Sequence, residues 1–344
     1  MRIDLKDLAL EELEAFIAGL GKERYRARQI IKWLYRHGAS SFDEMTDLAK
    51  GLRAELSDKV RISSLTPLAV ETSGDGTKKY LFGLEDGNQV ESVLIPDEGR
   101  LTLCISTQVG CAMGCLFCLT GKGGLARNLA TGEILNQILG VAEGLDKRDR
   151  ITNVVLMGMG EPLANYENVT RALGLMTSDL GFGLSRRRIT LSTVGLIPQM
   201  KRLCAEGVRC QLAVSLNAST QKVRSFLMPI SRRYPLGSLL EACRSLTLPP
   251  RERITFEYVL IRGINDSEFD ARKLLQIIRG IRCKVNLIPF NECPGITFQR
   301  PREQAVHLFQ RIMMEGGVTT IIREGRGGDI LAACGQLRGA LTGP

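Results

Sequence analysis

Three cysteines stand close together in the segment Gly110-Cys111-Ala-Met-Gly-Cys115-Leu-Phe-Cys118, with the spacing C-x3-C-x2-C. The chain has ten cysteines, and this spacing is expected by chance on the order of once in a hundred such chains. Thiolates are soft ligands for zinc or for iron–sulfur clusters. A zinc site usually takes four protein ligands in two pairs, and no second C-x2-C or H-x3-H pair occurs here. Three thiolates on one loop suit three corners of a [4Fe–4S] cluster, with structural thiols or zinc as the alternative.

Further polar residues stand where apolar segments end. The turn Met157-Gly-Met-Gly160-Glu161-Pro162 combines glycines, which permit close backbone approach, with an acidic residue that could pair with an ammonium group. Ser192, the run Ser215-Leu216-Asn217 and Asn291 hold comparable places after later apolar segments. Each could be an ordinary turn residue. Barrel enzymes, however, assemble their sites at the carboxyl ends of strands.

The elements that must position these residues alternate between apolar strands and amphipathic helices. Near-continuous apolar runs predict strands buried on both faces of a parallel sheet. We expect strands at residues 101–106, 153–157, 188–193, 211–216, 254–261 and 284–289, and helices at 131–142, 166–176, 197–206, 236–246 and 268–279. Six strand–helix units instead of eight favour an α/β fold class with a partial (βα)6 TIM-like barrel over residues 101–300.

Two segments precede this barrel, and a C-terminal extension, 301–344, follows it. Residues 61–100 predict a small β extension with strands at 78–82 and 90–95. Residues 1–60 predict a helical domain with helices at 8–20 and 25–37, and with a third helix capped by Ser41 that ends near Lys50. Basic residues cluster before and within the second helix, where they form either a solvated face or an RNA-docking module: Lys22, Arg24, Arg26 and Arg28.

The composition indicates the class of protein and the kind of partner it binds. The 344 residues are 44% hydrophobic and 24% charged, which is typical of a globular protein. The net charge of +9 favours a polyanionic partner, and nucleic acid over lipid, because no run reaches the roughly 18 apolar residues of a membrane helix. The N-terminus has no signal-peptide pattern. We therefore expect a cytoplasmic protein with no membrane partner.

The triplet, with its aromatic residue before the third cysteine and the later glycine–glutamate turn, resembles the radical S-adenosylmethionine superfamily. The resemblance implies that Cys111, Cys115 and Cys118 hold a [4Fe–4S] cluster and that S-adenosylmethionine binds its open iron. One electron then cleaves that sulfonium to a 5′-deoxyadenosyl radical. It also implies that the cofactor contacts the strand-end residues, namely Gly160, Glu161, Ser192, Ser215, Leu216, Asn217 and Asn291.

Two more cysteines indicate one family within this superfamily. Cys104 precedes the triplet, and Cys334 lies in the segment Ala-Ala-Cys-Gly-Gln-Leu. With Glu91 in Val-Glu-Ser-Val-Leu-Ile-Pro, they make the whole chain resemble the RlmN/Cfr-type RNA methyltransferases, most closely the dual-specificity members that act on adenine carbon 2. Taken alone, both cysteines read as small buried hydrophobes and Glu91 as a solvent-facing strand residue. Cys204, Cys210, Cys243, Cys283 and Cys293 match no family position and are expected to be structural.

The family resemblance implies methylation of carbon 2 of adenine in 23S ribosomal RNA and certain transfer RNAs, with two S-adenosylmethionine molecules per turnover. Cys334 would accept a methyl group, Glu91 would act as general base, and Cys104 would form a transient disulfide with Cys334. A monomer served by an electron donor such as flavodoxin or ferredoxin is expected. The alternatives are an adenine carbon 8 methyltransferase, a radical enzyme that modifies another macromolecule such as a protein, and a non-catalytic iron–sulfur RNA-binding protein.

Overall fold

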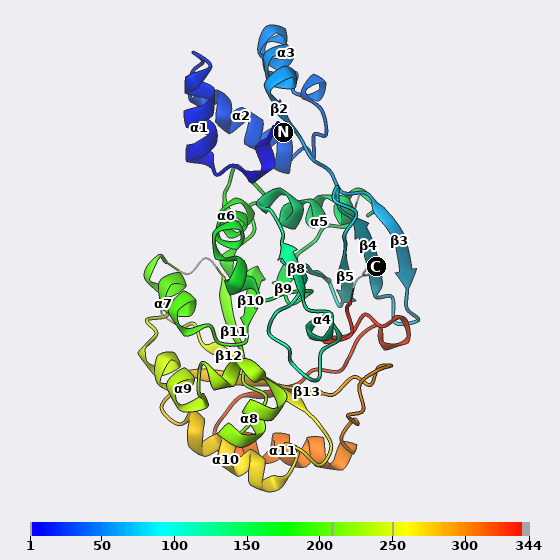
Figure 1. The fold of residues 1–344 in the computed structure, drawn as a ribbon, viewed down its shortest axis with the longest axis vertical. Helices are drawn as coiled ribbons and strands as arrows, with labels where there is room; N and C mark the ends of the chain where they lie inside the picture. Colours follow the sequence, from blue (N-terminus) through cyan, green and yellow to red (C-terminus); the bar gives the residue numbers. More distant parts are fainter. Residues whose placement is uncertain (1, 147, 208–209, 250, 339–344) are drawn as a thin grey trace.

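The structure is a computed structural model that describes residues 2–146, 148–207, 210–249 and 251–338 (Figure 1). Within these residues, ten strands form one sheet in the order β14-β13-β12-β11-β10-β9-β6-β5-β4-β3. Seven consecutive members of this order are parallel to one another: β6 (Arg100–Cys104), β9 (Asn153–Leu156), β10 (Ile189–Thr193), β11 (Gln211–Ser215), β12 (Ile254–Leu260), β13 (Cys283–Pro289) and β14 (Thr320–Ile322). The α/β partial barrel predicted from six strands is confirmed, and the short β14 extends it.

Helices connect the parallel strands and cover the sheet (Figure 1). They are α5 (Thr131–Glu143), α6 (Tyr166–Thr177), α7 (Ile197–Ala205), α8 (Gln221–Leu227), α9 (Leu236–Ser245), α10 (Glu268–Ile278) and α11 (Glu303–Glu315). Capping side chains determine where some of these helices begin. The Ser267 hydroxyl, for example, accepts a hydrogen bond from the Asp270 backbone N–H at 3.2 Å and caps α10. The strands from β9 to β14 have no exposed residue, and β12 is almost entirely buried, because both faces of a parallel sheet are covered.

Three antiparallel strands continue the same sheet beyond β6: β3 (Pro67–Thr72), β4 (Lys78–Gly83) and β5 (Gln89–Asp97). The predicted strands 78–82 and 90–95 lie within β4 and β5. The sequence did not predict β3, because this edge strand is largely exposed and has no buried–exposed alternation. The β extension is therefore hydrogen-bonded to the barrel through the pair β5–β6.

The N-terminal helices lie at one end of the molecule (Figure 1). They are α1 (Leu10–Gly19), α2 (Tyr25–Tyr35) and α3 (Lys50–Lys59), and β1 (Ile3–Asp4) pairs in parallel with β2 (Val60–Arg61). The predicted third helix from Ser41 is wrong. Phe42–Glu44 is a single 3-10 turn in which the Glu44 carboxylate accepts hydrogen bonds from the backbone N–H groups of Ser40 and Ser41, and α3 begins only at Lys50.

A buried lysine joins the N-terminal segment to the barrel. The Lys6 ammonium donates to the Ser63 carbonyl and to the Asn136 side-chain oxygen, both at 2.8 Å. Burial lowers the pKa of Lys6 to about 8. Asp7 accepts a hydrogen bond from the Gly132 backbone N–H at the start of α5. The residue boundaries of the four predicted segments, 1–60, 61–100, 101–300 and 301–344, stay a prediction.

The remaining elements surround the cysteine triplet. They are a hairpin of β7 (Gln108–Gly110) and β8 (Leu125–Asn128) and the short α4 (Leu119–Lys122) between them. Among the described residues, no helix has the length and apolar character to cross a membrane.

Gln137 on α5 is the polar link between the helical layer and the junction of β5 with β6. Its side-chain oxygen accepts from the Ser92 hydroxyl at 2.7 Å and from the Ser106 backbone N–H at 2.8 Å, and its amide donates to the Ser106 carbonyl at 2.9 Å. The side chain is fully buried, so all these partners depend on it.

We expect Gln137→Leu to lower the free energy of unfolding by about 2 kcal/mol, because it leaves buried polar groups at the β5–β6 junction unpaired. Chemical denaturation measures this change, with the exposed Gln276→Leu on α10 as the matched control. Equal stabilities for the two variants would contradict the structural role of Gln137.

Candidate active site

The cysteine loop is held on several sides by backbone hydrogen bonds. The Cys111 N–H donates to the Gly124 carbonyl at 2.7 Å, and the Leu116 N–H donates to the Leu227 carbonyl of α8 at 3.0 Å. Just before the loop, Gly110 has a φ of +76°, and a Cβ there would lie 2.0 Å from the Gly124 carbonyl oxygen. Only glycine satisfies both conditions, so the turn into the loop is sterically defined.

The three thiols share desolvated surroundings. Cys111 and Cys115 are buried and Cys118 is half-buried. Burial raises the pKa of Cys111 to about 12 and raises that of Cys115 well above its usual range, with a smaller contribution from the neighbouring thiols. These thiols therefore stay protonated at neutral pH unless a metal supplies positive charge and displaces the protons.

The donor set of the loop fits an iron–sulfur cluster, which is bound through cysteine sulfurs. In the part of the chain that the structure describes, no three His, Cys, Asp or Glu side chains are grouped as the ligands of one metal ion would be. The donor set is all sulfur, which soft iron–sulfur clusters prefer.

A cavity opens between the cysteine loop, the carboxyl ends of the parallel strands and the C-terminal segment. Its lining contains, besides the predicted cluster ligand Cys118 and the predicted methyl acceptor Cys334, all but one of the residues predicted to contact S-adenosylmethionine: Gly160, Glu161, Ser192, Ser215, Asn217 and Asn291. Residues at the carboxyl ends of β9 to β13 and Cys334 therefore lie around the same cavity. This is the position at which a barrel assembles its active site.

The other predicted residues do not line the cavity. Cys111 and Cys115 lie behind Cys118 in the loop, and Cys104 and Glu91 belong to the neighbouring strands β6 and β5. Leu216 is fully buried. Its N–H donates to the Glu257 carbonyl at 2.9 Å and its carbonyl accepts from Arg224. The structure therefore does not bring Leu216 to the cavity surface.

Glu161 is a buried carboxyl at the cavity wall. Its two oxygens accept from the backbone N–H groups of Leu163, at 3.1 Å, and Val194, at 2.8 Å. Burial nonetheless raises its pKa to about 7, because these hydrogen bonds only partly offset the lost hydration. An ammonium group placed in the cavity would favour the ionised form.

Two buried charged residues escaped the sequence reasoning. Arg224 on α8 is fully buried and donates to the carbonyls of Val194 and Ser215, so it ties together the carboxyl ends of β10 and β11. An arginine in a short helix gives no sequence signal of burial. Glu257 on β12 lines the cavity and accepts from the Asn286 side-chain amide at 2.9 Å. A charged residue within the apolar run Ile-Thr-Phe-Glu-Tyr-Val-Leu was a signal that could have found it.

Cys334 lines the cavity, and Cys104, outside the lining, is close enough for the Cys334 thiol to affect its pKa. Cys334 is reached by solvent through the cavity, and its carbonyl accepts from the Asn291 amide at 3.4 Å. Burial, and then the proximity of Cys334, raise the pKa of Cys104, while burial and Glu257 raise that of Cys334 to about 12. Every cysteine is a free thiol in the structure, so the disulfide between these two stays a prediction.

Glu91 faces the same side of the sheet as Cys104. Val93 is the cross-strand partner of Cys104, and Glu91 lies two residues from Val93 on β5, so their side chains share one face. The Glu91 carboxylate accepts from the Arg338 backbone N–H at 2.8 Å and lies 3.7 Å from the Lys79 ammonium. Glu91, the predicted general base, is thus buried and contacts Arg338 and Lys79, and it does not face solvent as a surface strand residue would.

Comparison with known proteins bears directly on this arrangement. Residues 3–62 match the ribosomal RNA large subunit methyltransferase N-terminal domain, and residues 105–274 match the radical SAM superfamily. The dual-specificity RNA methyltransferase RlmN of Pelobacter propionicus is 56% identical over 99% of this chain and 97% of its own. The chain belongs to the RlmN family. The RlmN of Geobacter sulfurreducens is also 56% identical, over 98% of this chain and 93% of its own.

A solved structure agrees with this membership. A radical SAM methyltransferase from Sphaerobacter thermophilus superimposes with a TM-score of 0.92 at 46% identity, and covers 98% of this chain and 99% of its own. As a radical S-adenosylmethionine protein of the RlmN family, the chain uses a [4Fe–4S] cluster and S-adenosylmethionine as cofactors. The individual residue roles stay predictions that the geometry above makes specific.

Glu257 gives a pH prediction. Burial raises its pKa from 4.5 to about 7, so the folded protein holds a proton that the unfolded chain releases, and stability falls as the pH rises through this window. We expect Glu257→Gln to be more stable than wild type at pH 8, by up to about 3 kcal/mol, with the difference shrinking toward pH 5. Thermal unfolding of the metal-free proteins measures it. The exposed Glu143→Gln is the control, and a pH-independent difference for Glu257→Gln would contradict the assignment.

Proposed function

We propose that this chain methylates carbon 2 of adenine in 23S ribosomal RNA and in certain transfer RNAs through an S-methyl intermediate on Cys334. The observation that carries the proposal is that Cys334 lines the same cavity as Cys118 and Glu161, with Cys104 close enough to Cys334 for that thiol to raise the Cys104 pKa. A methyl-accepting thiol at Cys334 would then face the bound cofactor and would have a second thiol in its neighbourhood. The names of the relatives, RNA methyltransferases of dual specificity, support an RNA substrate.

The chemistry explains the need for a thiol acceptor. Adenine carbon 2 is electron-poor and does not attack the electrophilic methyl group of S-adenosylmethionine, so a direct polar transfer fails. The bound cofactors supply an alkyl donor and, in a second molecule, a hydrogen-abstracting radical. Cys334 first accepts a methyl group as its thiolate, with loss of its proton. Loss of a hydrogen atom from that methyl group leaves a carbon radical that can add to the ring.

Release of the product uses Glu91 and Cys104. After addition, RNA is tethered to Cys334 through a methylene group. The adduct still carries the unpaired electron of the radical that added. Glu91 takes the ring proton at carbon 2 as general base, and the unpaired electron would return to the cluster that supplied one electron at the start, so the ring becomes aromatic again. The Cys104 thiolate attacks the Cys334 sulfur and forms a disulfide, while the carbon–sulfur bond breaks and its electron pair passes to the methylene carbon, which gains a proton and becomes the methyl group. Reduction of the disulfide restores the enzyme.

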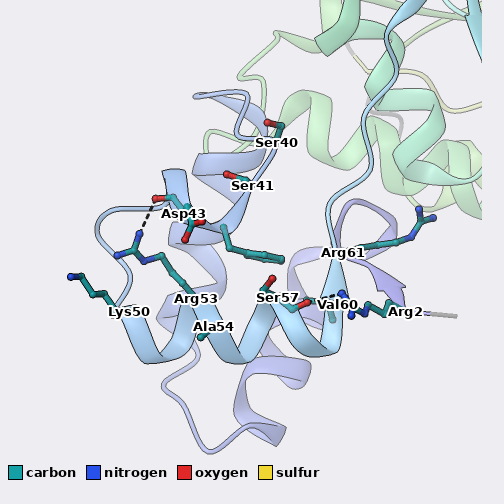
Figure 2. Close-up of a pocket in the computed structure, with 11 residues that line it drawn as sticks. Arg2, Ser40, Ser41, Asp43, Lys50, Arg53, Ala54, Ser57, Val60 and Arg61 are labelled. Carbon is teal, nitrogen blue, oxygen red and sulfur yellow. Dashed lines mark hydrogen bonds between the residues drawn. The ribbon is translucent and has the colours of Figure 1, made fainter.

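The proposal extends to the N-terminal domain as an RNA-docking module. The basic residues around α2 are mostly paired with acids: Lys22 with Glu55, Arg26 with Glu23, and Arg28 with Glu14. A cavity of about 610 Å³ lies instead between α3, β2 and the 3-10 turn, as Figure 2 shows. Four cations and one acid line it: Arg2, Lys50, Arg53, Arg61 and Asp43. Of these cations, Arg61 is ion-paired with Asp4, at 3.6 Å, and with Glu85.

The donors of this cavity suit phosphate groups. Arg53 donates from one terminal nitrogen to the Asp43 carbonyl at 2.8 Å, the contact drawn in Figure 2. Its Nε is buried and has no partner among the described residues. Ser40, Ser41 and Ser57 add hydroxyls to the lining. Guanidinium and hydroxyl groups around one hollow are the donors that contact nucleic-acid backbones.

The remaining partners complete the proposal. Reduction of the cluster requires a low-potential one-electron donor such as flavodoxin or ferredoxin. Ten free cysteines suit the reducing conditions of the cytoplasm. The proposal takes the chain to act as a monomer.

The electrostatic docking gives one prediction. RNA affinity should fall steeply with added salt, and Arg53→Gln should weaken binding and reduce the slope of log K against log salt by about 1. Filter binding or fluorescence anisotropy over a salt series measures this. Arg28→Gln, on the ion-paired face of α2, is the control with an unchanged slope. A flat salt response of the wild type would remove the docking role.

The catalytic proposal is tested by anaerobic reconstitution with iron and sulfide, followed by S-adenosylmethionine, a reductant and an RNA fragment. The wild type should give 5′-deoxyadenosine and 2-methyladenosine. Cys334→Ala should give no methylated RNA, and Cys104→Ala should leave RNA covalently tethered to the protein, because the resolving thiol is missing.

Each alternative predicts a different product. Methyl on adenine carbon 8 in mass spectra would assign the other activity of the family. A radical enzyme that modifies a protein would keep its activity in Cys334→Ala. A non-catalytic RNA-binding protein would not cleave S-adenosylmethionine at all.

A further inference from the structure

The segment that carries Cys334 is fastened at both of its ends to the β extension. Before the cysteine, the Asp329 carboxylate accepts from the Ser73 hydroxyl at 2.6 Å and from the Gly74 N–H at 3.2 Å. After it, the Arg338 N–H donates to Glu91. The turn between β3 and β4 and the strand β5 therefore hold the segment on both sides of Cys334.

Lys79 on β4 lies at the centre of these contacts. Its ammonium donates to the Ile330 carbonyl at 2.6 Å and lies 3.7 Å from the Glu91 carboxylate. Both side chains are about nine-tenths buried, which makes the pair stronger than a surface ion pair. Ile330 lies four residues before Cys334, and Arg338 lies four residues after it. Lys79 therefore binds the segment before the cysteine, and Glu91 binds it after the cysteine.

The sheet register places the Lys79 side chain on the same face of the sheet as Cys104 and Glu91. Lys79 is the cross-strand partner of Val93, and Val93 is the cross-strand partner of Cys104. Directly paired residues of antiparallel strands project to the same face. Lys79, Cys104 and Glu91 consequently share one face of the sheet, the face from which Glu91 binds the C-terminal segment.

Burial makes the role of Lys79 specific. A buried ammonium is costly unless it is paired and hydrogen-bonded, and Glu91 and the Ile330 carbonyl are the buried partners of Lys79. Its second acid, Glu71 at 3.2 Å, is more than half exposed and is a weaker partner. An apolar side chain of similar length would fill the space without linking the carboxylate to the segment.

We propose that Lys79 is a positioning residue that aligns Glu91 with the Cys334 segment for the release step. This inference rests on the proposed function. Lys79 touches neither the cysteine loop nor the lining of the cofactor cavity in the contacts described. Its loss should therefore spare the methylation of Cys334 and impair the later removal of the ring proton.

The test compares Lys79→Met, Lys79→Gln and Lys79→Arg with Lys78→Met, its half-buried neighbour on β4. Three readouts separate the steps. They are S-methylation of Cys334 by protein mass spectrometry without RNA, 2-methyladenosine in RNA, and covalent RNA–protein adduct on a denaturing gel. All use the full chain after anaerobic reconstitution.

We expect Lys79→Met and Lys79→Gln to methylate Cys334 as the wild type does, to form about tenfold less 2-methyladenosine, and to accumulate adduct. Lys79→Arg should restore most of the product, and Lys78→Met should match the wild type. Wild-type product yield in Lys79→Met, or an equal loss of Cys334 methylation and RNA methylation in both neutral variants, would overturn the inference. Absence of 2-methyladenosine with the wild type itself would instead overturn the proposed function.

Discussion

The desolvation of the cysteine loop is the constraint on which the rest of the site depends. Burial disfavours the thiolate forms of Cys111 and Cys115, so the loop gains charge only together with iron. Backbone hydrogen bonds hold the loop in place without charged side chains. One goes to the Leu227 carbonyl of α8, and the other goes to the Gly124 carbonyl just before β8. A metal bound at the loop would be the dominant charge at the mouth of the barrel, beside the cavity that Cys118 and the strand ends line.

A second constraint comes from the C-terminal segment, which must bring a reactive thiol to a barrel that is already complete. The segment returns from β14 across the sheet and is fixed by the β extension on one side and by the cysteine loop on the other, where the Leu119 N–H donates to the Gly335 carbonyl at 2.7 Å. The antiparallel extension is thus part of the active site's framework. The strand of Glu91 and the strand of Cys104 are directly paired, because β5 pairs with β6.

Sequence patterns predicted what depends on local spacing. The cysteine triplet, the glycine–glutamate turn and the apolar strands of the barrel were all accessible, because each is encoded within a few consecutive residues. The start of α3 and the edge strand β3 were not, because exposure there leaves no periodic signal. Arg224 and Lys79 were also inaccessible. Lys79 meets Ile330 across 251 residues of sequence, and only the folded sheet brings them together.

The account depends most directly on the identity of the metal. Anaerobically reconstituted protein should contain about four iron atoms per chain, and added S-adenosylmethionine should perturb the electron paramagnetic resonance signal of the reduced cluster. Alanine at any one of Cys111, Cys115 and Cys118 should abolish this. A colourless protein that binds stoichiometric zinc, with no response to S-adenosylmethionine, would contradict the central claim.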